Sequence, residues 1–358
     1  MARQVGLVDR SAREQLQRSF DKAGVQPLPQ PYRPGRVKAA DVGIEDPGEK
    51  LNFLALGDVG GVKTPGPQNA VSVAMQQRQQ TAAFVLILGD VVYFNGQEMG
   101  EVEGRQTGYM DQFYEAYAKL ARPIIPFPGN HDAEPEPKDT SLSGFMTNFC
   151  DSSPKNPPED PRLEFGRHTQ TLPYCEWTLE LEAVTIVAVY TNAPEGGHLE
   201  PEQLQRLTQE LKEADPDKPL IVGLHHPPYS IDSHHGGSEP MGKALDQAIA
   251  AAGRAPDLVL AGHVHNYQRF TRTIAGKQVT YIVSGNGGYH NLHQLAKGIE
   301  PGEKPESDIT FELGDASQYG FLQLSVSGGA ISGEYVGVKP GAMPDGSDAK
   351  ITPAVDTF

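Results

Sequence analysis

The chain has few cysteines and no long apolar run. It has two cysteines, Cys150 and Cys175, among 358 residues, which excludes a disulfide scaffold and a cysteine-rich zinc module. The two thiols can form one disulfide or stay free, and the sequence leaves both alternatives open. There is no run of about eighteen apolar residues, so we expect no segment that spans a membrane.

Basic residues are also scarce. Thirty lysines and arginines stand against 46 aspartates and glutamates, which gives a formal net charge of −16. Nucleic-acid polymers bind basic surfaces, so this acidic surplus argues against them as partners. The surplus is typical of a well-hydrated protein surface whose negative charge repels other copies of the same protein. It leaves the oligomeric state undetermined.

The first twenty residues lack the apolar segment of a signal peptide. The chain as it stands is therefore predicted to be cytoplasmic. A processed precursor would lack that segment too, so a periplasmic or secreted location stays open.

Apolar runs and helical patterns alternate through most of the chain, which predicts an α/β fold with helices outside buried strands. We expect a short N-terminal helix and a proline-rich arm over 1–50, and one large α/β domain over 51–338. Within that domain, residues 134–170 are rich in Pro, Asp, Glu and Ser and are predicted to form a surface insertion. A tail over 339–358 completes the chain. The expected helices span about 68–80, 108–120, 200–214 and 240–252.

Polar side chains follow five of the expected strands at the points where the strands end. They are Asp58, Asp90, the run Asn130-His131-Asp132, the pair His225-His226, and the pair His263 and His265. In α/β sheets, ligands bind outside the carboxyl ends of the strands. Each motif alone is an ordinary turn or loop, but five of them at successive strand ends indicate one shared site.

The first of these loops, LALGDVGGVKT at residues 54–64, allows a second interpretation. Gly57 with Lys63 and Thr64 nearly matches a phosphate-binding loop. However, Val62 stands where the second glycine is required, and we expect Pro65-Gly66-Pro67 to delay the helix that would face the phosphate. A carboxylate metal ligand is therefore the preferred interpretation.

The number of candidate ligands specifies the kind of metal site. Two carboxylates, one amide oxygen and three imidazoles are too many for one tetrahedral zinc ion. They suit two cations that share a carboxylate, the arrangement with which many phosphatases hold the attacking and leaving oxygens.

Taken together, the motifs resemble those of the calcineurin-like metallophosphoesterases and, more narrowly, of the purple acid phosphatases. That family has the blocks GDxG, GDxxY, GNH[DE], VxxH and GHxH. Here the blocks stand in order at 57–60, 89–93, 129–132, 222–225 and 262–265. The resemblance implies a four-layer sandwich, in which two mixed β-sheets are flanked by helices. The N-terminal β-sandwich of the plant members has no counterpart in this sequence.

The resemblance also implies how the ligands divide between two metals. One metal would take Asp58, Asp90, Tyr93 and His265. The other would take Asp90, Asn130, His225 and His263, so that Asp90 bridges. Many relatives have a histidine ligand where this chain has Gly60, and Tyr93 would compensate for it. A phenolate favours Fe(III) at the first site, with Fe, Zn or Mn at the second. The alternative for Tyr93 is a buried core aromatic.

Three further histidines match residues that lie near the substrate in the family. They are His131, His234 and His235, which would bind phosphate or protonate the leaving group; the alternative for the last two is an idle loop pair. The implied activity is hydrolysis of small phosphate monoesters by in-line attack of a metal-bound hydroxide. A phosphodiesterase, a nucleotide phosphohydrolase or a metal-containing binding protein without activity are the alternatives.

Overall fold

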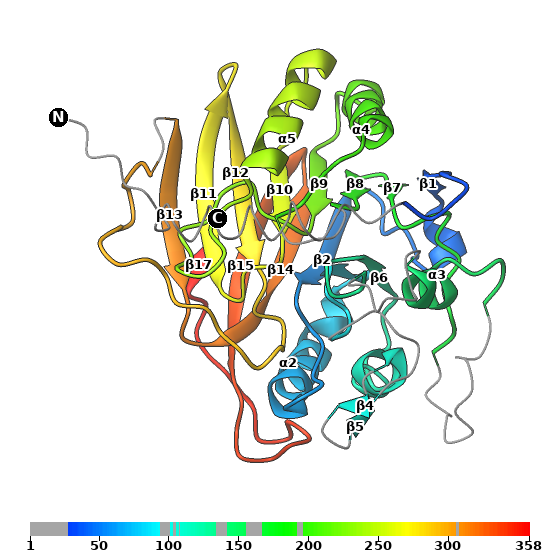
Figure 1. Cartoon of the computed structure of the whole chain (residues 1–358), viewed down its shortest axis with the longest axis vertical. Helices are drawn as coiled ribbons and strands as arrows, with labels where there is room; N and C mark the ends of the chain where they lie inside the picture. Colours follow the sequence, from blue (N-terminus) through cyan, green and yellow to red (C-terminus); the bar gives the residue numbers. More distant parts are fainter. Residues whose placement is uncertain are drawn as a thin grey trace.

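Two large β-sheets and their flanking helices form four layers, as expected from the sequence (Figure 1). The structure is a computed structural model, and it describes residues 28–93, 101–102, 105–106, 108–133, 142–154, 167–191, 196–305 and 308–358. The helix expected near the start of the chain lies outside these residues.

The first sheet has eight strands within the described residues, in the order β1-β7-β8-β9-β10-β12-β11-β13. Its strands are β1 (Gly35–Val37), β7 (Trp177–Glu180), β8 (Thr185–Val189), β9 (Leu220–Leu224), β10 (Leu258–Ala261), β11 (Tyr267–Ile274), β12 (Lys277–Ser284) and β13 (Ile309–Asp315). Strands β8, β9, β10 and β12 run parallel, so their carboxyl ends lie at one edge.

The second sheet has seven strands within the described residues, in the order β16-β15-β14-β2-β3-β6, with β17 also paired to β15. Its strands are β2 (Lys50–Leu56), β3 (Val85–Leu88), β6 (Ile124–Phe127), β14 (Tyr319–Ser327), β15 (Ala330–Lys339), β16 (Lys350–Ile351) and β17 (Asp356–Thr357). Strands β2, β3 and β6 are parallel. A separate hairpin joins β4 (Glu101–Val102) to β5 (Arg105–Gln106).

Helices cover the outer faces of both sheets. Helix α4 (Pro201–Glu213) packs beside α5 (Glu239–Ala252) over the first sheet, and α2 (Pro65–Arg78) packs on β14 and β15 of the second (Figure 1). The remaining helical segments are η1 (Ala39–Val42), η2 (Gln79–Thr81), η3 (Met110–Glu115) and α3 (Ser143–Phe149). In the part of the chain that the structure describes, none of the helices has the length and apolarity needed to cross a membrane.

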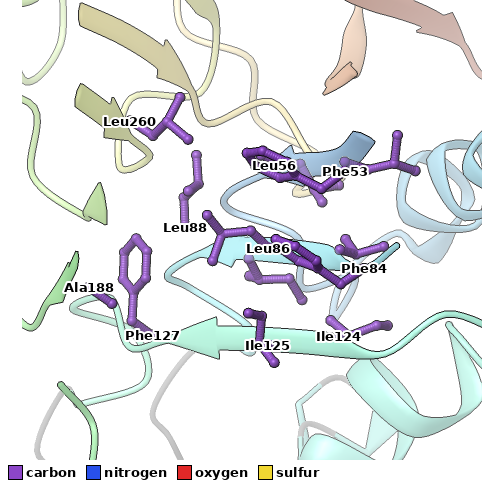
Figure 2. Packing of buried hydrophobic residues seen from close by; sticks show 14 of the residues in the cluster. Phe53, Leu56, Phe84, Leu86, Leu88, Ile124, Ile125, Phe127, Ala188 and Leu260 are labelled. Atoms are coloured by element: carbon purple, nitrogen blue, oxygen red, sulfur yellow. The ribbon is translucent and has the colours of Figure 1, made fainter. Parts of the chain in front are cut away.

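The period-two pattern of the strands explains how the layers pack. In β8, Ile186 and Ala188 belong to the core between the sheets, whereas Val187 and Val189 belong to the core under α4 and α5. A strand that is buried on both faces reads as a continuous apolar run, because neither face meets water. Figure 2 shows the inter-sheet core, with Leu56, Leu88 and Phe127 near the ends of β2, β3 and β6.

One helix start differs from the sequence prediction. Helix α2 begins at Pro65, with Thr64 as its N-cap, so the expectation that Pro65-Gly66-Pro67 delays the helix is wrong. Proline is favoured in the first helical turn because its φ is already helical and its missing N–H needs no partner there.

In the described residues, the segments on both sides of the domain expected at 51–338 contribute short strands to the sheets. Strand β1 pairs with β7, and β16 and β17 pair with β15. Asp356 of β17 accepts hydrogen bonds from Arg269 at 2.6 and 2.9 Å. The predicted tail at 339–358 therefore contributes the short strands β16 and β17 to the second sheet.

The expected surface insertion at 134–170 is only partly described. Its helix α3 buries Phe145 and Phe149, and the Phe149 ring packs against Tyr109 and Phe113, so this part is not a surface segment. Residues 134–141 and 155–166 lie outside the described residues. Cys150, within this region, and Cys175, just beyond it, are both free thiols.

Candidate metal centre

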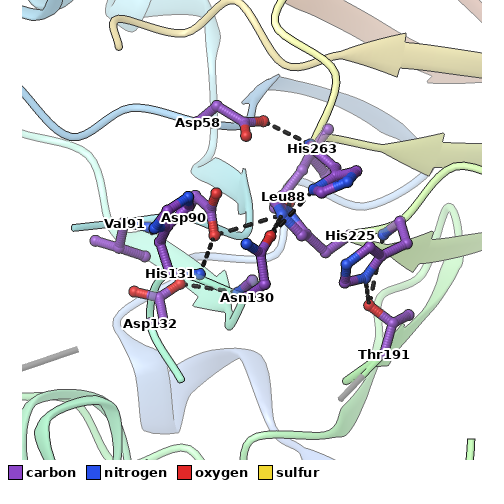
Figure 3. Close-up of polar contacts among 12 residues, drawn as sticks. Asp58, Leu88, Asp90, Val91, Asn130, His131, Asp132, Thr191, His225 and His263 are labelled. Atoms are coloured by element: carbon purple, nitrogen blue, oxygen red, sulfur yellow. Dashed lines mark hydrogen bonds and ion pairs between the residues drawn. The ribbon is translucent and has the colours of Figure 1, made fainter. Parts of the chain in front are cut away.

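The loops that follow β2, β3, β6, β9 and β10 meet where the carboxyl edges of the two sheets face each other. Figure 3 shows Asp58, Asp90, Asn130 and His263 reaching toward one another from these loops. All seven residues predicted as ligands from the sequence come together here, and all seven are buried. Their binding of metal remains a prediction.

The backbone at this point is strained. Asp58, Asp90 and His263 have φ values of 58°, 53° and 69°, in the left-handed region that non-glycine residues avoid. Among the described residues, only two other non-glycine residues, Leu142 and Ala275, share this feature. Strained residues persist only where their surroundings hold them, and they cluster at functional sites.

One side of the centre, which we call the phenol side, consists of Asp58, Tyr93 and His265. Tyr93 Oη lies 3.2 Å from Asp58 Oδ1 and 3.3 Å from His265 Nε2. His265 Nε2 is 3.4 Å from the same Asp58 oxygen. Three donor atoms of different side chains therefore converge on one point.

The other side, which we call the amide side, consists of Asn130, His225 and His263. Asn130 Oδ1 lies 3.0 Å from His225 Nε2 and 3.1 Å from His263 Nδ1. Within the described chain, the buried Asn130 Nδ2 has no hydrogen-bond partner, which is consistent with an amide placed for its oxygen rather than for packing.

Asp90 lies between the two sides. Its Oδ1 is 3.4 Å from His225 Nε2 on the amide side. One donor atom each of Asp58, Asp90 and His225 lies within 4.8 Å of the others. This position is what a carboxylate shared by two cations requires.

Backbone carbonyls orient two of the imidazoles. His225 Nδ1 lies 2.8 Å from the Leu88 carbonyl oxygen, and His265 Nδ1 lies 2.7 Å from that of Asn291. A carbonyl oxygen can only accept, so each Nδ1 must carry the hydrogen. The lone pair of each neutral ring is then on Nε2, which faces the acidic side chains, as in histidines that bind metals.

The protonation of the centre is governed by burial and by the charges of its neighbours. Burial opposes the protonation of His225, but Asp90 and Asp58 outweigh it and raise the pKa of His225 to about 9. Burial, together with Asp90 and Asp58, raises the pKa of the Tyr93 phenol well above its usual value. Without a cation the phenol keeps its proton, so a phenolate here requires a bound metal.

Tyr93 occupies the space that a side chain at position 60 would need. A Cβ added to Gly60 would lie 2.7 Å from Tyr93 Cδ2 and 2.4 Å from Gln112 Oε1. A histidine at position 60 and the tyrosine in this position therefore exclude each other. This exclusion supports the prediction that Tyr93 replaces the usual histidine ligand.

Gln112 of η3 fixes the backbone of Tyr93. Its Oε1 accepts a hydrogen bond from Tyr93 N at 3.0 Å, and its Nε2 donates to Tyr93 O at 2.6 Å. On one face, the Tyr93 ring stacks on Tyr289 with centroids 3.8 Å apart. The phenol thus has little freedom to turn away from Asp58.

Asp132 joins the loops that follow β3 and β6. It accepts hydrogen bonds from Val91 N at 3.1 Å, from Gly129 N at 2.9 Å and from Tyr109 Oη at 3.0 Å. Burial and the nearby Asp90 raise its pKa to about 7. The last residue of the third motif therefore positions the loops that carry Asp90 and Asn130.

The three histidines predicted to be catalytic lie around the centre. His131 is half-buried, its ring is 4.3 Å from that of Tyr93, and its backbone N–H donates to Asp90 Oδ1 at 2.9 Å. The ring of His235, also half-buried, is 4.4 Å from that of His263. His234 is exposed beside it, with ring centroids 4.5 Å apart.

Two further buried histidines were not predicted as site residues. The ring of His226 is 4.4 Å from that of His263, and its Nδ1 is 2.6 Å from Thr191 Oγ1. The ring of His293 stacks on that of His265 at 4.2 Å. The sequence already placed His226 at this strand end beside His225, but no ligand or catalytic role was predicted for it. His293 belongs to no motif and lies on the loop after β12, so only the fold reveals it.

The phosphate-loop interpretation gains no support from the structure. Lys63 and Thr64 are exposed, whereas Val62 is buried against Tyr93 and Tyr289. The side chain that was predicted to crowd a phosphate instead packs behind the phenol side of the centre.

Comparison with known proteins agrees with the predicted family. The family model described as calcineurin-like phosphoesterase matches residues 51–267. Tartrate-resistant acid phosphatase type 5 of Rattus norvegicus is 27% identical over 317 residues, which cover 81% of this chain and 88% of the rat protein. Purple acid phosphatase 21 of Arabidopsis thaliana is 25% identical over 307 residues, 78% of this chain and 64% of that protein.

Solved structures share the fold. The purple acid phosphatase from yellow lupin (Lupinus luteus) seeds superimposes with a TM-score of 0.61 at 18% identity, over 87% of this chain and 53% of the lupin chain. The chain thus spans just over half of that protein and less than two thirds of the Arabidopsis one.

Proposed function

The chain belongs to the calcineurin-like phosphoesterase family, and on that premise we propose that it hydrolyses small phosphate monoesters at a centre of two metal ions. The observation that carries the proposal is the position of Asp90 between two complete donor groups. A single cation would need only one of these groups.

The donors on the two sides suit different cations. Asp58, Asp90, Tyr93 and His265 would hold one ion, and the two carboxylates and a phenolate favour Fe(III) there. Asp90, Asn130, His225 and His263 would hold the other, and an amide with two imidazoles suits divalent Fe, Zn or Mn. When bound, the two ions supply positive charge that polarises the phosphate and activates water.

The protein's own residues would bind and orient the substrate. His131 has its ring on Tyr93 and its backbone tied to Asp90, so it borders the centre from the β6 side. His234 and His235 border it from the loop after β9. These imidazoles can donate hydrogen bonds to phosphate oxygens, and one of them can hold the proton that the leaving alkoxide takes.

The placement of these imidazoles favours a monoester over a diester. A monoester has one more oxygen free of a substituent and carries more negative charge. Several imidazole donors around the centre can bind such a terminal phosphate. In a diester, a second substituent occupies one of these phosphate oxygens. That oxygen carries no negative charge, so an imidazole cannot bind it as an anion.

Similar proteins suggest two alternative functions. A probable cyclic nucleotide phosphodiesterase of Rhodopseudomonas palustris is 27% identical over 207 residues, 56% of this chain and 64% of that protein, and makes a diesterase the second candidate. The Plasmodium protein GAP50, described as the anchor in the inner membrane complex, shares the fold with a TM-score of 0.57 at 14% identity over 86% of this chain and 88% of that one. A binding protein without activity is therefore the third candidate.

Assays on metal-depleted and reconstituted protein separate the three candidates. We expect an aryl phosphate monoester to be hydrolysed faster than the matching diester, and only after metal is restored. Elemental analysis of the reconstituted protein should give two ions per chain. Faster hydrolysis of the diester would favour the second candidate, and two bound ions with neither activity would favour the third.

A further inference from the structure

Three histidines form a second group of metal-type ligands beside the centre. We call His234, His235 and His293 the three-histidine cluster. One ring nitrogen of each lies within 4.8 Å of the other two. His234 is exposed, His235 is half-buried and His293 is buried, so the cluster opens to solvent on one side.

The fold holds these rings together from two separate loops. Asp232 Oδ2 accepts hydrogen bonds from the backbone N–H groups of His234 at 2.9 Å and His235 at 2.5 Å. On the other loop, His293 N donates to the His265 carbonyl at 2.9 Å. The His293 ring is 4.7 Å from the His234 ring and 5.0 Å from the His235 ring.

We propose that the three-histidine cluster binds a third divalent cation of the zinc type, in addition to the two of the proposed centre. Three imidazoles with an open fourth position form a common zinc site. With Zn–N bonds of about 2.0–2.1 Å, each ring nitrogen has to move by less than about 1 Å toward a common point. Because His234 is exposed and lies on a loop, it can make most of that adjustment.

The cluster is distinct from the centre although it touches it. His293 stacks on His265 at 4.2 Å, and His235 lies 4.4 Å from His263. The His293 ring stacks face to face on His265, whereas the His235 and His263 rings are tilted by 40°. His265 N donates to His293 Nδ1 at 3.4 Å, so Nε2 is the ring nitrogen of His293 that is left for a metal. The cluster and the two sides of the centre share no ligand.

A buried carboxylate beside the cluster favours a bound cation. Asp232 has no exposed surface, and its Oδ2 lies 3.9 Å from His293 Nδ1. Its Oδ1 has no hydrogen-bond partner in the described part of the chain. A carboxylate beside histidines that bind a metal orients them and adds negative charge that stabilises the bound cation.

The third ion would regulate the proposed function, and this consequence rests on that function. If His234 and His235 bind phosphate and supply a proton, a cation on their nitrogens removes both abilities. We therefore expect free zinc to inhibit over the same concentration range in which the third ion binds.

Metal binding can be tested without any assay of activity. Protein carrying its resident ions is dialysed against increasing Zn²⁺, and bound metal is measured by elemental analysis. We expect wild type to take up one ion more than the variants His234→Ala and His293→Gln, whose affinity for that ion should fall more than about tenfold. His234→Ala, which changes an exposed side chain, should keep the resident ions and the wild-type melting temperature.

The matched control is His198→Ala, which removes a histidine whose ring is exposed beside Glu200. It should bind the third ion as wild type does. The inference is overturned if wild type takes up no additional ion, or if His234→Ala takes it up with wild-type affinity. His234 is exposed, so this variant stays informative even if His293→Gln fails to fold. An inactive protein that still takes up the third ion would contradict only the proposed function.

Discussion

The phenol side and the amide side of the centre are built from the same two sheets but differ in charge. On the phenol side, Asp58 and Tyr93 come from the second sheet and meet His265 from the first. On the amide side, Asn130 comes from the second sheet and meets His225 and His263 from the first. Each side therefore ties the sheets together, but only the phenol side has acidic donors of its own.

This difference would allow one scaffold to hold the two unlike cations that we propose. The phenol side offers a carboxylate and a phenol that loses its proton only to a strong Lewis acid, because its pKa is raised well above the usual value. The amide side offers neutral donors, which bind divalent ions without concentrating charge. Asp90 is the ligand that the two sides would share.

Removing the shared ligand Asp90 should release the metal ions from both the phenol side and the amide side. Asp90→Asn takes away the charge that would serve both ions, so we expect loss of both and a fall in phosphatase activity of more than about a hundredfold. Elemental analysis and an aryl monoester assay measure the two effects. The control is Asp217→Asn, the same change at an exposed position. Two retained ions with normal turnover would contradict the shared role.

Tyr93→Phe should affect the phenol side alone. The ring volume is conserved, and the ring contacts with Tyr289 and His131 are retained, so the fold should persist. We expect aerobically isolated wild type to be coloured by phenolate-to-Fe(III) charge transfer, and the variant to be pale. Retention of iron should fall more than about tenfold, with a shift toward Mn or Zn. A colourless wild-type protein that contains only divalent metals would contradict the proposal that Tyr93 binds Fe(III) as a phenolate.

The two sides should also differ in how pH changes metal affinity. In the metal-free protein His225 holds a proton up to pH about 9, and a metal must displace it. Affinity at the amide side should therefore rise about tenfold per pH unit below that value and then level off. Affinity at the phenol side should keep rising, because the pKa of Tyr93 is higher still.

Calorimetric titration of metal into apoprotein, in buffers with different ionisation enthalpies, counts the released protons. Tyr93→Phe and His225→Ala should each release one fewer. Equal proton release by wild type and Tyr93→Phe would show that the phenol does not ionise on binding.

Gly60→Ala should disturb the phenol side by a smaller amount. The added Cβ would meet Gln112 Oε1 and Tyr93 Cδ2, so either the ring or its clamp must shift. We expect a loss of stability of about 1–3 kcal/mol from this overpacking, with a few-fold weaker hold on iron. Thermal melting and the visible spectrum measure both. Gly242→Ala on α5, where the nearest heavy atom is 3.9 Å away, should be neutral or stabilising.

Lys63→Ala should leave both sides unchanged. Lys63 is exposed and belongs to neither donor group. We expect turnover within a few-fold of wild type and unaltered metal content. Loss of nucleotide binding with full metal content would instead support the phosphate-loop interpretation of this segment.

The sequence was sufficient for the fold class and for the gathering of the predicted ligands. Each of these residues lies within a few positions of a buried apolar run, and the carboxyl ends of parallel strands share an edge. The sequence immediately around Asp58, Asp90 and Asn130 was enough to predict them as ligands. It failed at Pro65, because the same residue that breaks a helix interior is favoured at a helix start.

Only the tertiary structure shows which residues support the predicted ligands. Gln112 clamps Tyr93 from 19 positions away in the sequence, and His293 reaches His265 from 28 positions away. No local pattern marks either residue, since glutamine and histidine occur in any loop or helix. Their roles arise only when packing of the two sheets brings distant loops within hydrogen-bond distance. The sequence determined which donors stand at the strand ends, and the packing of the sheets decided what holds them there.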